Sequence, residues 1–115
     1  MSIEQNELRR LQELAAKAAG LTIRGYDFGT PSRHACVLID TGAAQPVRWS
    51  SWFNDGDAFR LFVDLGLQAS PPRSAKESAW CSGFASVGVF PPRMLMRMAI
   101  TSAAADRALQ MGLAA

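Results

Sequence analysis

Three stretches of the chain place hydrophobic residues at helical spacing, one at each end and one in the middle. In the first stretch, the positions expected to face inward are Leu8, Leu11, Leu14, Ala15 and Ala18. Ser2 followed three residues later by Gln5 fits a capping box, which predicts Ser2 as the N-cap. Gly20 predicts the end of this helix, because glycine commonly follows the last helical residues.

The second and third stretches predict helices with similar boundary signals. The middle helix carries four apolar residues on one face, Ala58, Leu61, Phe62 and Leu65. Asp55 is its predicted N-cap, and Gly66 predicts its end. The last helix is expected to run from Arg93 to about Gln110, with Gly112 beyond it, and Pro92 would suit its N1 position. Its predicted inward residues are Leu95, Met98, Ala99, Ser102, Ala105 and Leu109.

Short apolar runs between the first two helices predict strands. Residues 21–28 alternate in hydrophobicity on either side of Gly25, which indicates a β-bulge at that glycine. The runs 35–39 and 47–49 are shorter, and the first is rich in β-branched and apolar residues. Together the three runs predict an antiparallel meander.

The region before the last helix is harder to interpret because it is rich in Gly and Ser. Residues 68–77 are polar and contain two prolines, which predicts a loop. Residues 79–81 and 85–90 predict a hairpin that turns at 82–84. The expected order is α-β-β-β-α-β-β-α, an α+β fold with a mainly antiparallel sheet of about five strands packed against two or three helices.

Length and composition fit one cytoplasmic domain over residues 1–115. Hydrophobic residues make up 49% of the chain, enough to form a core at this length. The start of the chain is polar, and no stretch approaches the ~20 apolar residues that would span a bilayer. Two cysteines without a CxxC pair predict free thiols in a reducing compartment. We therefore expect no membrane association.

The net charge of +2 is mild, but ten of the twelve cationic residues are arginine. Arginine favours bidentate contact with carboxylates and phosphates. Basic positions nevertheless alternate with acidic ones, which is typical of a solvated mixed surface. Nucleic-acid binding is therefore the less favoured interpretation of the arginines.

Trp49, Trp52 and Phe53 form a dense aromatic cluster beside Arg48. Such a cluster is typical of a hot spot for a protein partner, and it could also stack on nucleic-acid bases. The structural alternative is that the tryptophans anchor the middle helix to the sheet. Phe53 is the better candidate for exposure, because a polar loop begins there.

The adjacent segment Asn54–Asp57 offers oxygen ligands for a cation. It lacks the further ligands and the distal Glu of an EF-hand loop, however. Capping of the middle helix by Asp55, with Asp57 favourable in its first turn, is the preferred interpretation. We expect no metal and no cofactor, and we keep Asp55 and Asp57 as candidates for partner binding.

Arg93 and Arg97 accompany three methionines, at positions 94, 96 and 98, at the start of the last helix. This pattern could bind phosphate or offer an adaptable surface to a partner. Methionines two positions apart cannot all face one core, and Met96 is the expected outlier. One prediction is therefore partner binding at Arg93, Met96 and Arg97, with a homodimer formed through this helix. The equally weighted structural alternative is a core in which the methionines fill gaps.

His34 and Cys36 are the only hint of catalysis. They lie two residues apart, so a strand would present both on one face. No Gly-x-Ser-x-Gly elbow or similar motif accompanies them. A small enzyme using His34 and Cys36 is accordingly the weakest of the functional hypotheses.

The segment from Trp49 to Leu67, with Asp55–Gly56–Asp57 leading into a helix that ends Leu65–Gly66–Leu67, resembles small proteins of tailed phages and prophages. It is similar to the NinX-like phage family of unknown function. The alanine-rich first and last helices fit this resemblance more loosely. The chain departs from the pattern at Ser50–Ser51, where Asn-Pro is expected. The resemblance implies a phage origin and carries no active site.

We therefore expect a non-enzymatic phage or prophage accessory protein in the cytoplasm of a bacterial host. It would act by protein–protein contact to modulate host machinery or defence. A nucleic-acid-binding regulator is the alternative, with steeply salt-dependent binding.

Overall fold

The computed structural model describes residues 4–70, 79–81, 84–86 and 90–114 of the chain. The three predicted helices are present, namely α1 (Gln5–Ala18), α2 (Asp55–Asp64) and α3 (Pro92–Gln110). The strands are β1 (Ile23–Asp27), β2 (Cys36–Ile39), β3 (Val47–Trp49), β4 (Ala69–Ser70), β5 (Ala79–Cys81) and β6 (Phe84–Ser86). The α+β class predicted from the sequence is confirmed.

The helix ends are close to those predicted, but two N-caps are corrected. Glu4 caps α1, because its carboxylate accepts hydrogen bonds from the backbone N–H groups of Asn6 and Glu7. The predicted cap Ser2 lies outside the described residues. Asn54 rather than Asp55 caps α2, since its side chain accepts from the Asp57 N–H at 2.9 Å. At α2 the correction exchanges one short acceptor side chain for its neighbour, whereas at α1 the longer Glu4 carboxylate takes the capping role.

The first sheet is antiparallel with strand order β1-β2-β3, as the meander predicted. The register between β1 and β2 shifts between Ile23 and Gly25, which confirms the predicted bulge. Val37 faces Trp49 across β2 and β3. Both side chains are buried, so Trp49 lies on the face of the sheet that packs against the core.

The second sheet corrects the prediction of one sheet with about five strands. Strands β4, β5 and β6 form a separate antiparallel sheet, in which Ala69 pairs with Cys81 and Cys81 with Phe84. The strand β4 falls where a loop was predicted, and Phe84 lies in β6 rather than in the turn. Residues 87–89 of the predicted second hairpin strand lie outside the described part.

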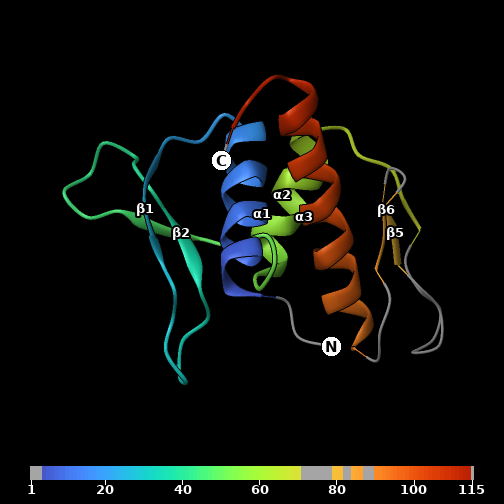
Figure 1. The fold of residues 1–115 in the computed structure, drawn as a ribbon, viewed down its shortest axis with the longest axis horizontal. Coiled ribbons are helices and arrows are strands. Elements are labelled where there is room, and N and C mark those ends of the chain that lie inside the picture. Colours follow the sequence, from blue (N-terminus) through green and yellow to red (C-terminus); the bar gives the residue numbers. More distant parts are fainter. Residues whose placement is uncertain (1–3, 71–78, 82–83, 87–89, 115) are drawn as a thin grey trace.

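The helices occupy the middle of the molecule, with one sheet on either side (Figure 1). The first sheet lies against α1, whereas β5 and β6 lie against α3. The helix α2 sits behind the other two in this view and contacts α3. The two sheets therefore cannot pair with each other, because the helices separate them.

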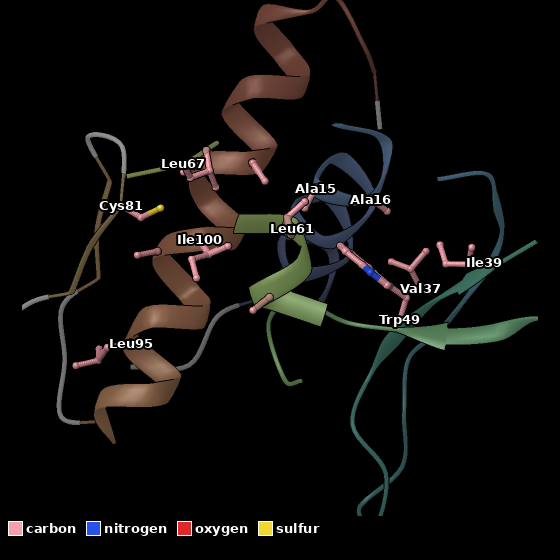
Figure 2. Close-up of a cluster of buried hydrophobic side chains, with 14 residues drawn as sticks. Ala15, Ala16, Val37, Ile39, Trp49, Leu61, Leu67, Cys81, Leu95 and Ile100 are labelled. Carbon is pink, nitrogen blue, oxygen red and sulfur yellow. The ribbon is translucent and has the colours of Figure 1, made fainter. Parts of the chain in front are cut away.

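One cluster of buried apolar side chains connects both sheets through the helices (Figure 2). Val37, Ile39 and Trp49 lie at the end next to the first sheet, and Leu95 and Cys81 at the opposite end. Burial of such side chains is the main favourable contribution to folding, at about 25 cal/mol per Å² of apolar surface. The core thus contains side chains from all three helices and from both sheets.

Small residues line the contact between α1 and α3, the most extensive contact between described elements. Leu14 and Ala18 pack there against Ala105 and Ala108. Alanine side chains let the two helices approach closely, which suits the alanine-rich sequences at both ends. The predicted inward position Leu109 is wrong: its side chain is 46% exposed, because the buried face passes through Ala108 instead.

Cys36 and Cys81 are buried, and no disulfide joins them. They lie in different sheets on opposite sides of the helices. Among the described residues, no helix has both the length and the apolar character needed to cross a membrane.

Candidate functional site

The residues predicted from the sequence to bind a partner lie either in the buried core or at two hollows on the surface. Trp49 and Trp52 are buried, with only 9% and 5% of their surfaces exposed. Their side chains are therefore core anchors and not an exposed hot spot. Phe53 is half-buried, while Asp55, Arg93, Met96 and Arg97 meet at one place on the surface.

A buried polar network holds the segment after Trp49 in position. The Ser50 hydroxyl donates to the side-chain oxygen of Gln12 and accepts from the Phe53 N–H. The Ser50 N–H donates to Asp57 at 2.9 Å, and Gln12 also donates to the Tyr26 hydroxyl at 3.0 Å. In the described part, every fully buried side-chain nitrogen or oxygen atom has a hydrogen-bond partner. Asp57 and Ser50 are accordingly structural.

A hollow of about 280 Å³ opens beside this network, and we call it the polar hollow. Its lining includes His34, Cys36, Arg48 and Phe53. The His34 and Phe53 rings stack nearly parallel, with their centroids 4.5 Å apart. The structure thus brings both residues of the weak enzyme hypothesis to one place, next to an aromatic ring nominated separately.

The charges around the polar hollow are paired within the chain. The Asp27 carboxylate accepts from Arg33 at 2.7 Å, from Arg48 at 2.6 Å and from the Gly29 N–H at 2.8 Å. Arg48 also donates to the His34 carbonyl at 2.7 Å. The Gly29 hydrogen bond, followed by that of Arg48, lowers the pKa of Asp27 below its ordinary value.

Gly29 is required by this arrangement. Its φ is +83°, and a Cβ atom there would lie 2.6 Å from the Arg33 carbonyl oxygen. Any other residue would strain the backbone and displace the loop. The loop that carries His34 is therefore held by Gly29 and by the two arginine contacts to Asp27.

The environment of Cys36 works against a catalytic thiol. Burial raises the pKa of this cysteine above its ordinary value. The reactive form of a cysteine is the thiolate, and active cysteines have lowered pKa values. A nucleophilic role for Cys36 is thus unfavourable at neutral pH.

A second and larger hollow of about 360 Å³ lies between α2 and α3. Its walls are formed by Ala58, Phe59, Phe62, Met96 and Ile100, with Asp55, Arg93 and Arg97 at one end. We call it the α2–α3 groove. Phe59 is 65% exposed, the largest fraction among the large hydrophobic residues that the structure describes as exposed.

Two arginines of α3 join this helix to α2 and to the residues that flank it. Arg97 donates to Asp55 at 2.6 Å and to the Trp52 carbonyl at 2.9 Å, whereas Arg107 donates to the Leu65 carbonyl at 3.3 Å. Arg97 and Arg107 are ten residues apart, and so are Asp55 and Leu65. The helices α2 and α3 therefore run in the same direction in a fixed register.

The two arginines at the charged end of the groove differ in their environment. The Arg97 side chain is only 17% exposed, and its carboxylate contact is short. The Arg93 side chain is 84% exposed, and its contact with Asp55 is 3.5 Å. Asp55 thus contacts both arginines, closely through one oxygen and at 3.5 Å through the other, and the largely exposed Arg93 guanidinium stays accessible to a further acceptor.

The described residues do not bring together three or more His, Cys, Asp or Glu side chains that could hold a metal ion. The Asn54–Asp57 segment serves as the start of α2 instead. Asn54 is the cap, Asp55 reaches across to α3, and Asp57 accepts from the Ser50 backbone. The segment thus caps α2 through Asn54 rather than through the predicted Asp55.

Sequence reasoning missed Phe59 and Gln12. Phe59 lies one position from the inward stripe of α2, and a single apolar residue at such a position is common on surfaces. Gln12 is fully buried although glutamine is mostly exposed, and its partners Tyr26 and Ser50 are distant in sequence. The methionines 94, 96 and 98 are all half-buried, and Met96 lines the groove.

Comparisons with protein-family models, curated proteins and solved structures found no match to this chain. The similarity to the NinX-like phage family therefore stays a hypothesis that rests on the residues from Trp49 to Leu67.

Proposed function

We propose that this chain is a non-enzymatic binding protein that takes an apolar segment of another protein into the α2–α3 groove. The observation that carries the proposal is the groove itself. Apolar walls surround about 360 Å³, an exposed phenylalanine borders it, and charged groups lie at one end. Ligand sites are typically concave and apolar with a few placed polar groups.

The two helices that form the groove are joined to each other before any partner arrives. Arg97 joins α3 to Asp55 and to the Trp52 carbonyl, and Arg107 joins the far end of α3 to Leu65. Binding to a preformed site avoids much of the entropy cost of ordering side chains. The position of Arg97 therefore supports binding although the residue itself is largely covered.

The resemblance of the segment from Trp49 to Leu67 to phage proteins adds the biological part of the proposal. The partner would be a bacterial protein, and the chain would modulate host machinery or defence from the cytoplasm. The groove uses Asp55, Phe59 and Phe62 from this same segment. The proposed phage role is independent of the proposal that the groove binds a protein segment.

The test is a pull-down from bacterial lysate with three proteins, the natural chain, Phe59→Ala and Phe28→Ala. Phe28 is a matched control because it is also an exposed phenylalanine, at 47%, and lies outside the groove. We expect a protein that the natural chain and Phe28→Ala retain and that Phe59→Ala loses. Equal retention by all three proteins, or none by any, would contradict the proposal.

The polar hollow supports nucleic-acid binding as a second candidate function. The exposed His34 ring stacks on Phe53, with Arg33 and Arg48 around the same hollow. Stacking rings beside arginines are typical of single-strand binding. Asp27 neutralises part of this charge, so the groove carries the stronger case. Fluorescence anisotropy with a single-stranded oligonucleotide at low salt tests this candidate, and no binding would eliminate it.

A further inference from the structure

The charged end of the α2–α3 groove identifies the chemistry of its occupant. We infer that the partner segment is an amphipathic helix whose apolar side chains enter the groove and whose flanking carboxylate binds Arg93. The inference rests on the proposed function and names the class of partner for the same site.

The shape of the groove fits a helix. Its walls extend from Asp55 to Phe62 along α2, which is about two turns or roughly 10 Å at 1.5 Å per residue. An amphipathic helix presents apolar side chains at i, i+4 and i+7, so it covers two turns with two or three anchors. Phe59, Phe62 and Met96 offer adaptable apolar contacts to such anchors.

The charges favour an acidic flank. Two guanidinium groups and one carboxylate stand at this end, 2 − 1 = +1 in net charge. Arg97 uses the carboxylate of Asp55 at 2.6 Å and the Trp52 carbonyl. Arg93 keeps only a 3.5 Å contact and 84% of its side-chain surface. The guanidinium fork of Arg93 matches a carboxylate in two parallel hydrogen bonds.

The experiment selects binders from a displayed library of random peptides of roughly 15 residues, about four helical turns. The bait is the natural chain or Arg93→Glu. This change does not threaten α3, because a helix N-terminus favours a negative residue. The natural chain should select peptides with Asp or Glu beside the apolar anchors. Arg93→Glu should select Lys or Arg at the same place.

Affinities of one selected acidic peptide complete the test. Replacing its acidic residue by Lys should weaken binding to the natural chain about fivefold, the scale of an exposed ion pair. Phe59→Ala should weaken binding about tenfold or more, as loss of an aromatic anchor does, while Phe28→Ala should not.

The outcomes separate the two claims. If peptides bind through Phe59 but show no charge preference, the acidic partner is overturned and the groove stays a binding site. If no peptide binds, both claims fall. If light scattering instead shows a dimer that Phe59→Ala dissociates, the occupant is a second copy of this chain, which also overturns the inference.

Discussion

The α2–α3 groove and the polar hollow are close in volume, about 360 and 280 Å³, yet their charges are used differently. In the polar hollow, Asp27 binds both Arg33 and Arg48, and Asp57 is tied to the Ser50 backbone. At the groove, one carboxylate faces two arginines and leaves Arg93 accessible. The difference predicts that substitutions at the hollow change stability, whereas substitution of the exposed groove residues Phe59 and Arg93 changes binding.

The largest expected effect is a loss of unfolding free energy when the polar hollow is altered. Asp57→Ala removes the acceptor of the buried Ser50 N–H, and an unsatisfied buried donor costs about 2 kcal/mol of unfolding free energy. Asp64→Ala is the matched control, an exposed acid at the last residue of α2 whose removal should be neutral. Denaturant unfolding measures both variants.

Peptide binding by Asp57→Ala tests whether the groove works independently of the polar hollow. The Asp57 side chain does not line the groove, so the folded variant should bind a selected peptide as the natural chain does. Weaker peptide binding without lost stability would contradict the division between the two hollows.

An intermediate effect on the unfolding free energy is expected when the two arginines at the groove are substituted. Arg97→Ala loses contacts to Asp55 and to the Trp52 carbonyl, which should lower the unfolding free energy by about 1–2 kcal/mol. Arg93→Ala should change it by no more than about 0.5 kcal/mol, because exposed ion pairs contribute little. Arg97→Lys keeps the positive charge but lacks the planar guanidinium group. Its loss of unfolding free energy should lie between those of the two alanine variants. Equal losses for Arg93→Ala and Arg97→Ala would remove the distinction between a fixed and an available arginine.

The helices and the bulge could be predicted from the sequence because their signals are local. The apolar spacing of α2 and the glycine after its last turn are read within twelve residues, and Gly25 marks the β1 bulge directly. Strand pairing is not local. The chain order does not show that the helices separate β1–β3 from β4–β6, and the two-residue β4 has too little sequence to predict it.

The candidate site was predictable in parts. Asp55, Arg93 and Arg97 were nominated for separate reasons, and only the fold shows that they meet. The burial of Trp49 and Trp52 could not be decided from an aromatic cluster, because the same residue types serve cores and interfaces. Asp55 was predicted as a cap and instead bridges to α3, a contact across about forty residues.

The smallest expected effect concerns the paired charges of the polar hollow and appears only in acid. The folded-state pKa of Asp27 lies below its ordinary value of 3.8, chiefly because the Gly29 N–H donates to it and next because Arg48 does. A lowered folded-state pKa means that Asp27 contributes stability above the unfolded-state value. That contribution is lost as the pH falls below 3.8 and through the folded-state pKa.

Asp27→Asn isolates this effect. The melting temperatures of the natural chain and the variant should differ by a constant amount above about pH 5 and converge as the pH falls below the ordinary Asp value near 4. A difference that persists unchanged in acid would show that the charge of Asp27 does not hold Arg33 and Arg48. The same variant releases both arginines, so oligonucleotide binding at low salt should increase if the polar hollow is a nucleic-acid site. Unchanged oligonucleotide binding would indicate that the polar hollow has only a structural role. The α2–α3 groove would then be the remaining candidate for a binding surface.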